Sequence, residues 1–164
     1  MRYALLLLVI LLGGCYSFKG VSIPDGAGYF TVLDFDNKAY QVVPGLAEDF
    51  AELLRNEIRN NTSLSYTNDP DKADLIFRGF IQEYRTTSRA PQADQQVAIN
   101  QLTMAVHVEY ADAHNEKNGW SRNFNRQEEY PADQNFLDIR DQINQSLTKQ
   151  LVEDIFNAAF TEKW

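Results

Sequence analysis

Two stretches of the chain repeat apolar residues at the spacing of a helix. In the first, Pro44 precedes a stripe with charged residues largely on its other side: Leu46, Phe50, Leu53, Leu54 and Ile58. Proline is well tolerated at a helix start, because its missing N–H would have no partner there. The second stripe is longer and steps by three and then by fours: Phe136, Ile139, Ile143, Leu147, Leu151, Ile155 and Ala159, joined late by Val152, Phe156 and Phe160. The pattern predicts two helices, each with one buried face.

Four other segments have the composition or the alternation of strands: residues 29–35, 74–87, 97–111 and 120–130. The third alternates most cleanly, and its inward face is Leu102, Met104, Val106, Val108 and Tyr110. The segment 74–87 is apolar on both faces, which predicts an inner strand. One face carries Leu75, Phe77 and Ile81, and the other carries Ile76, Phe80 and Tyr84. In the fourth, Trp120 and Phe124 share one face.

The order of these elements is strand, helix, three meandering strands, helix. Both helices carry an apolar stripe that must be buried against another element. A sheet with one covered face buries both stripes at once. The sequence therefore predicts an α+β domain in which two helices pack on one face of a four-stranded sheet.

The first fourteen residues have the features of a lipoprotein signal. Arg2 precedes an apolar run that is too short to span a bilayer, which needs about 20 apolar residues. Gly13 and Gly14 then precede Cys15, the only cysteine, as at the cleavage site of a bacterial lipoprotein precursor. We expect residues 1–14 to be removed and acyl chains on Cys15 to anchor the mature chain in a membrane. An ordinary signal peptide with an accidental cysteine is the alternative.

The segment after the cysteine predicts how the domain is attached and where it resides. Residues 15–28 are rich in glycine and hold Pro24, which is typical of a tether, and residues 29–164 then form a single domain. Tyr16, and not an acidic residue, follows Cys15, and residues 17–21 contain no acidic run. We therefore expect sorting to the outer membrane, with the domain on the periplasmic side.

The charge of the mature chain narrows the class of partner. Of the 15 Lys and Arg residues, Arg2 leaves with the signal, so 14 remain against 23 Asp and Glu, a net charge of −9. Nucleic acid is excluded as a partner, because its phosphates require clustered Lys and Arg. The sequence holds no Gly-rich phosphate loop and no Gly-x-Ser-x-Gly motif, and His107 and His114 have no partners at metal-ligand spacing. We expect neither an enzyme nor a metal or cofactor site.

The few basic residues form two small groups on the predicted strands. Arg78, Arg85 and Arg89 lie on or after the second strand, next to the polar segment 87–96, while Arg122 and Arg126 share a face of the fourth. In an acidic protein such groups are candidate contacts for a phosphate or for the carboxylates of a partner. Pairing with Glu or Asp on neighbouring strands is the alternative interpretation.

Several segments resemble the LptE family of lipopolysaccharide-assembly lipoproteins. They cover most of the mature chain in order: residues 14–18, 20–24, 74–81, 100–108 and 150–157. The resemblance implies a two-helix, four-stranded fold and residence at the inner leaflet of the outer membrane. It also implies a plug inside the large β-barrel LptD, where such proteins help to assemble the barrel and to pass lipopolysaccharide to the cell surface. The basic lipopolysaccharide-contacting residues of the family have no matching positions in this chain.

The same sequence is also compatible with a different class of function. The chain is alternatively a free-standing periplasmic binding or assembly module that is tethered to the membrane but not seated in a barrel. A plug should expose a broad surface of polar and aromatic residues fitted to a lumen. A module for a small ligand should instead show one enclosed apolar pocket.

Overall fold

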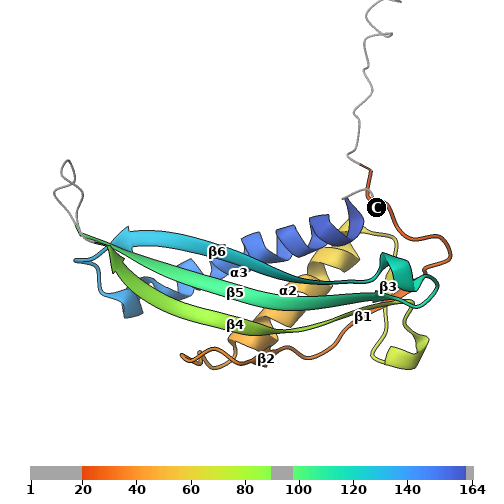
Figure 1. Ribbon diagram of the computed structural model, residues 1–164, viewed down its shortest axis with the longest axis horizontal. Coiled ribbons are helices and arrows are strands. Elements are labelled where there is room, and N and C mark those ends of the chain that lie inside the picture. Colours follow the sequence, from red (N-terminus) through yellow and green to blue (C-terminus); the bar gives the residue numbers. More distant parts are fainter. Residues whose placement is uncertain (1–19, 90–97, 162–164) are drawn as a thin grey trace, which may run out of the picture.

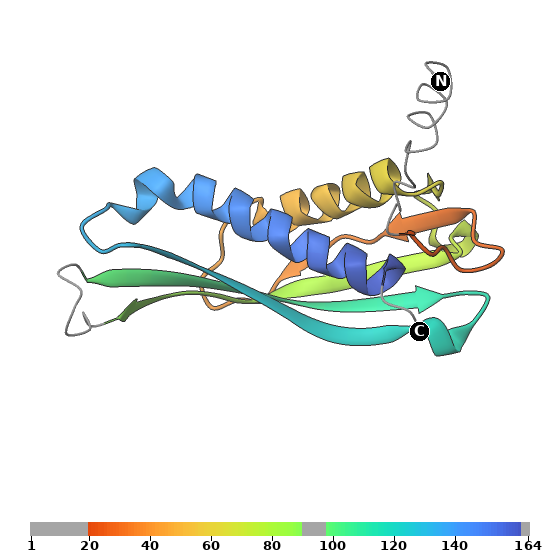
Figure 2. The same ribbon diagram turned by 90° about the horizontal axis from the view of Figure 1, so that it is seen from above.

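Both helices lie on one face of a single twisted sheet (Figure 1, Figure 2). The computed structural model describes residues 20–89 and 98–161. The helices are α2 (Leu46–Asn61) and α3 (Phe136–Phe160). The strands are β1 (Tyr29–Val32), β2 (Asp36–Asn37), β3 (Ser65–Tyr66), β4 (Leu75–Arg89), β5 (Ile99–Asp112) and β6 (Trp120–Pro131). Two short 3₁₀ turns, η1 (Pro70–Lys72) and η2 (Glu116–Asn118), precede β4 and β6.

The sheet has six strands, so the prediction of a four-stranded sheet was wrong in the number of strands. The strand order is β3-β1-β4-β5-β6, and β2 pairs with β4. The additional strands, β2 and β3, have two residues each, which is too short for an alternating pattern to be detected in the sequence. The α+β class and the placement of both helices on one face are confirmed.

The long strands β4, β5 and β6 form an antiparallel meander along the length of the molecule (Figure 1). β1 pairs with β4 in parallel, and α2 is part of the connection that a parallel pair requires. The core lies between the meander and the helices, where Phe77, Val106, Leu147, Leu151 and Ile155 are fully buried. These residues come from the apolar stripes of β4, β5 and α3, as the sequence predicted.

A bulge in β4 changes which of its residues reach the core. The register with β5 shifts between Ile81 and Glu83. Because a shift of one residue moves a side chain to the other face, Tyr84 points into the core with Phe77 and is 2% exposed. The sequence-based assignment of Tyr84 to the opposite face was therefore wrong. The Tyr84 hydroxyl donates a 2.7 Å hydrogen bond to Asn144 Oδ1 of α3, and burial raises the pKa of Tyr84.

α2 begins one residue after Gly45, which adopts the left-handed conformation at φ 80°. This conformation suits a glycine, so the helix starts at Leu46 and not at Pro44. Phe50, Leu54 and Ile58 of the predicted stripe are fully buried. Leu53 is not part of the buried face, because 40% of its surface is exposed.

The part of the expected tether that the structure describes, residues 20–28, is held against the domain. The Ser22 N–H donates a 2.7 Å hydrogen bond to the Phe160 carbonyl at the end of α3. Val21, Ile23 and Ala27 pack against the core. Cys15 and the signal lie outside the described residues. No helix within residues 20–89 or 98–161 is long and apolar enough to cross a membrane.

Asp74 connects the end of this segment to the sheet through hydrogen bonds. Because its carboxylate accepts these bonds, we expect the stability of the fold to depend on pH. Its Oδ2 accepts 2.8 Å hydrogen bonds from the N–H groups of Gly28 and Tyr29, and its Oδ1 lies 2.9 Å from His114 Nε2. The two backbone donors, ahead of His114, lower the pKa of Asp74 below its usual 3.8. A lowered pKa in the folded state stabilises the fold above the unfolded-state pKa, and this stabilisation is lost as the pH falls through the folded-state value.

We therefore expect Asp74→Asn to be less stable than the parent near pH 6, with a difference that shrinks as the pH falls below about 4. Urea unfolding of both proteins at a series of pH values measures this difference. Asp71→Asn is a matched control, because Asp71 is an exposed residue of the neighbouring turn η1. A difference between Asp74→Asn and the parent that stays constant from pH 6 to pH 3 would contradict the assignment.

Candidate functional site

The face of β4, β5 and β6 that points away from both helices is the surface on which most of the candidate residues lie (Figure 2). We call it the open face. It consists of the residues that alternate with the core residues: Arg78, Phe80, Glu83, Arg85, Thr87 and Arg89 of β4; Gln101, Thr103, His107 and Glu109 of β5; Ser121, Asn123, Asn125, Gln127 and Glu129 of β6. Amides, hydroxyls and charged groups dominate it.

Arg78 anchors a polar network at one end of the open face. Its Nε donates a 2.6 Å hydrogen bond to Glu109 Oε2 on the neighbouring strand, which lowers the pKa of Glu109. Glu109 Oε1 lies 3.6 Å from His107 Nε2. The His107 ring continues the network to β6, with Nδ1 2.7 Å from Asn123 Oδ1 and Nε2 3.2 Å from Ser121 Oγ. Five side chains, each of a different type, are thus joined across three strands.

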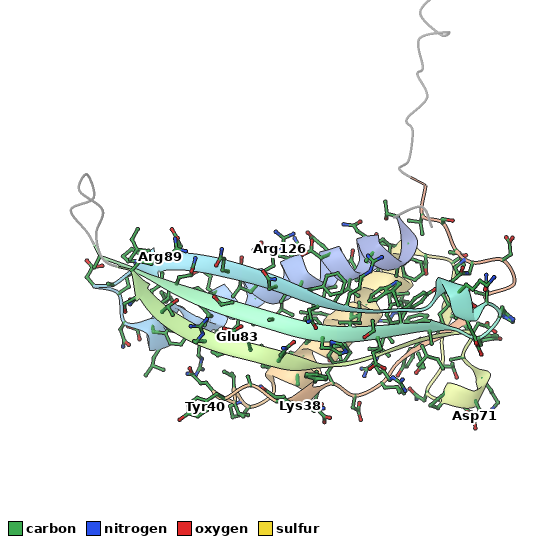
Figure 3. The ribbon with its side chains drawn as sticks, in the orientation of Figure 1. Lys38, Tyr40, Asp71, Glu83, Arg89 and Arg126 are labelled. Carbon is green, nitrogen blue, oxygen red and sulfur yellow. The ribbon has the colours of Figure 1, made fainter. Side chains whose placement is uncertain are left out.

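Arg89 anchors a second network at the other end, next to the end of the β4–β5 hairpin (Figure 3). Its Nη1 donates to Glu129 Oε1 at 3.1 Å, and its Nη2 donates to Gln101 Oε1 at 3.2 Å. Arg85 lies between the two networks and donates from Nε to Glu83 Oε1 at 2.8 Å. Residues 90–96 of the polar segment 87–96 lie outside the described residues, while its first residues, 87–89, belong to β4.

Arg122 and Arg126 share a face of β6 as expected, but it is the face that points toward the helices. They lie opposite Val108 and Met104, both of which are core residues. Arg126 makes a bidentate contact with Asp154 of α3, at 2.6 Å from Nε and 2.5 Å from Nη2. The Arg122 guanidinium lies 5.3 Å from the centre of the Trp120 ring. The structure therefore does not bring these two residues together with Arg78, Arg85 and Arg89.

Each of the three arginines on the open face has a carboxylate partner. Pairing with Glu or Asp was the alternative interpretation of these residues in the sequence. The partners Glu109 and Glu129 were missed because they depend on the strand register. The side chains of Arg78, Arg85 and Arg89 nevertheless remain between 57% and 65% exposed. Exposed ion pairs contribute only about 0–1 kcal/mol each, so these groups can exchange partners at low cost. Whether they contact a partner stays a prediction.

The hollows of the described surface are open and charged. The hollow between α2 and α3 has a volume of about 440 Å³ and carries Asp49, Glu52 and Asp141. Another, of about 410 Å³, lies on the open face and includes Arg78 and Glu109. Neither is the enclosed apolar pocket expected for a small-ligand module. Within the described residues, no group of three His, Cys, Asp or Glu side chains is arranged to hold a metal ion.

Comparison with known families decides the identity of this fold. The family model described as LptE, lipopolysaccharide-assembly, matches residues 29–159, which is most of the chain. The chain belongs to the LptE family. At the level of its family this LptE protein is a lipopolysaccharide-assembly lipoprotein, and the family is not an enzyme family. A search of curated protein sequences found no match.

Solved structures share the fold of this LptE protein at low sequence identity. Rare lipoprotein B from Shewanella oneidensis is 11% identical, with a TM-score of 0.52, covering 80% of this chain and 90% of that one. A minor lipoprotein from Acinetobacter baumannii is 12% identical, with a TM-score of 0.52, covering 80% and 91%. PelC from Paraburkholderia phytofirmans, a dodecamer, is 12% identical, with a TM-score of 0.54, covering 87% and 94%. The likeness is one of fold.

Proposed function

We propose that this LptE-family protein is an outer-membrane lipoprotein that plugs the LptD β-barrel and helps to assemble it, thereby assisting insertion of lipopolysaccharide at the cell surface. The observation that carries the proposal is the family match over residues 29–159. The open face supports it, because a broad surface of polar and exposed ion-paired side chains on three rigid strands suits the polar lumen of a barrel.

The structure favours a macromolecular partner over a small ligand. The hollow between the helices is open and has carboxylates at its rim, whereas small-ligand sites are mostly apolar and bury most of the ligand. A free-standing assembly module that is not seated in a barrel is the second candidate. The likeness to PelC, which was solved as a dodecamer, is the observation in its favour.

Depletion of the protein in its own cells tests the proposed function. We expect the LptD-type barrel to lose its folded, heat-modifiable form, and newly made lipopolysaccharide to be lost from the cell surface. The barrel's messenger level should stay constant, so that the effect is on assembly. A folded barrel and normal surface lipopolysaccharide after depletion would contradict the proposal.

The anchor of this lipoprotein is predicted to be Cys15. Intact-mass spectrometry of the mature protein should find no residue before Cys15 and an acyl-bearing mass on that residue. Cys15→Ala should abolish both the cleavage and the added mass, because the lipid is attached through the thiol. An unmodified thiol at Cys15 in the mature protein would show the interpretation to be wrong. Digestion of the domain by protease added to intact cells would contradict the periplasmic orientation.

We predict that the hairpin end of the open face contacts the barrel or the phosphates of lipopolysaccharide. Arg85→Glu with Arg89→Glu reverses two charges there. It should weaken co-purification with the barrel or raise outer-membrane permeability, since charge-assisted bonds contribute about 1.5–3 kcal/mol each. The melting temperature should stay nearly unchanged, because the two exposed ion pairs that are lost contribute little.

The matched control for this variant reverses two charges on the helices. Arg59→Glu with Lys149→Glu makes the same change in net charge on exposed residues of α2 and α3. It should leave both barrel association and permeability at parental levels. If the Arg85 and Arg89 variant also keeps association and barrier function, the hairpin end is not the contact.

A further inference from the structure

The hollow between α2 and α3 combines exposed aliphatic side chains with charged groups, and neither the packing of the core nor the open face accounts for this combination. We call it the helix groove and define it by Val43, Asp49, Glu52 and Leu53 on the α2 side and by Arg140, Asp141 and Asn144 on α3. Its volume of about 440 Å³ is enough for several side chains of another molecule. The two helices that line it lie on the side of the sheet opposite the open face (Figure 2).

Exposed aliphatic side chains occur in the segments that line the helix groove. Among the residues that the structure describes, the aliphatic side chains with large exposed surfaces are Val42 at 60%, Leu53 at 40% and Leu137 at 66%. Val42 directly precedes Val43, and Leu53 lines the groove. Leu137 lies four and seven residues before Asp141 and Asn144, so it is on the same face of α3. A cluster of exposed apolar residues beside a groove is typical of an interaction site.

The charge of the rim determines the chemistry of the occupant. Asp49 and Glu52 lie on the α2 side and form no ion pair with any described residue. On α3, Asp141 contacts Arg140, which also lines the groove, at 3.0 Å, so the rim carries three carboxylates and one guanidinium. Aliphatic side chains on the α2 side and an excess of carboxylates over cations at the rim complement a segment whose one face is aliphatic and whose other face carries Lys or Arg. The buried Asn144 side chain, fixed by the Tyr84 hydroxyl, gives the floor a rigid polar group.

We propose that the helix groove binds a basic amphipathic segment of a partner protein, with its aliphatic side chains against Leu53 and Leu137 and its cations between Asp49, Glu52 and Asp141. This is the helix-in-groove mode of recognition. The contact is separate from the open face, so the protein holds two partner surfaces on opposite sides. The inference goes beyond the proposed function and does not require that the partner be the barrel.

The experiment measures binding of a defined probe to the full mature domain. The probe is a synthetic Lys/Leu amphipathic peptide of about 16 residues, with leucines at helical spacing. A peptide of the same composition in scrambled order, and one with Glu in place of Lys, are compared by titration calorimetry. We expect binding of the first peptide alone, and weakening by added salt.

Charge reversal on each wall of the groove tests the location. Glu52→Lys with Asp141→Lys should weaken binding of the Lys/Leu peptide about tenfold, since two ion pairs are lost. The matched control, Glu57→Lys with Glu153→Lys, makes the same change on the same two helices. These residues line a separate hollow outside the groove, so the control should bind like the parent. Leu53→Ser should also weaken binding, without any change in charge.

Equal weakening by both charge variants, or equal binding of the scrambled peptide, would overturn the proposal, because the attraction would then be general to an acidic protein. Absence of binding to the parent would also overturn it. These outcomes leave the proposed function unaffected. Failure of the parent to associate with the barrel would instead contradict the proposed function and leave the groove measurement intact.

Discussion

Leu147→Ala in α3 is expected to lower the free energy of unfolding by about 2–5 kcal/mol. The Leu147 side chain is fully buried in the layer between α3 and the sheet, and its truncation leaves a cavity that the neighbouring side chains cannot fill completely. The same holds for Leu151→Ala, one turn further along the helix. Urea unfolding followed by circular dichroism measures both changes.

Leu137→Ala is the control on the same helix. Leu137 is 66% exposed, so its truncation should change the free energy of unfolding by less than about 0.5 kcal/mol. If Leu147→Ala and Leu151→Ala unfold at the same urea concentration as the parent, α3 is not packed on the sheet.

Gly79→Ala is expected to destabilise the fold by about 3 kcal/mol, at the upper end of the usual range for overpacking. A Cβ atom at this position would lie 2.2 Å from the His107 carbonyl oxygen of β5 and 2.9 Å from the Phe35 ring. The first neighbour is backbone, so a side-chain rotation cannot relieve the contact. Phe35 is buried beside Phe50, at 5.1 Å between ring centres, and occupies the space that the glycine leaves.

Gly20→Ala provides the matched control, because nothing lies within 4 Å of a Cβ atom there. The thermal unfolding midpoints of the two variants should therefore differ by many degrees, with Gly20→Ala close to the parent. A Gly79→Ala protein as stable as the parent would mean that β4 and β5 do not approach each other as the structure shows.

The elements with a long, uninterrupted pattern were predictable from the sequence. α3 spans the predicted 136–160, because its stripe is regular over seven turns and Pro131 marks the end of the strand before it. β5 alternates over its whole length, and its predicted inward residues, such as Val106 and Val108, are all buried. In these segments, tertiary packing and local pattern favour the same structure.

The rest of the fold depended on contacts that leave little local signal. The bulge after Ile81 moved Tyr84 into the core, and nothing in the alternation before it indicates an extra residue. β2 and β3 each consist of two residues and exist through pairing with β4 and β1. Leu53 continues the apolar stripe of α2 in sequence, but its side chain is 40% exposed.

The sequence allowed us to pick out the candidate arginines, but it did not predict which side chains each of them contacts. Residues two apart on a strand share a face, so Arg122 and Arg126 lie on the same face of β6 as Trp120 and Phe124. The sequence alone indicated this placement. The pairing of Arg78 with Glu109 and of Arg89 with Glu129 was not, since it depends on the register of β5 with both neighbours. A pattern in one strand does not determine that register.

The central claim is that this LptE-family lipoprotein resides in an outer-membrane barrel. The most direct measurement is to purify the tagged mature protein from its own membranes in mild detergent and to identify by mass spectrometry what co-purifies, with an untagged strain as the control. The account predicts one dominant partner, a large LptD-type β-barrel protein that elutes together with it. Elution of the lipoprotein alone, or only as an assembly of its own copies, would contradict the account.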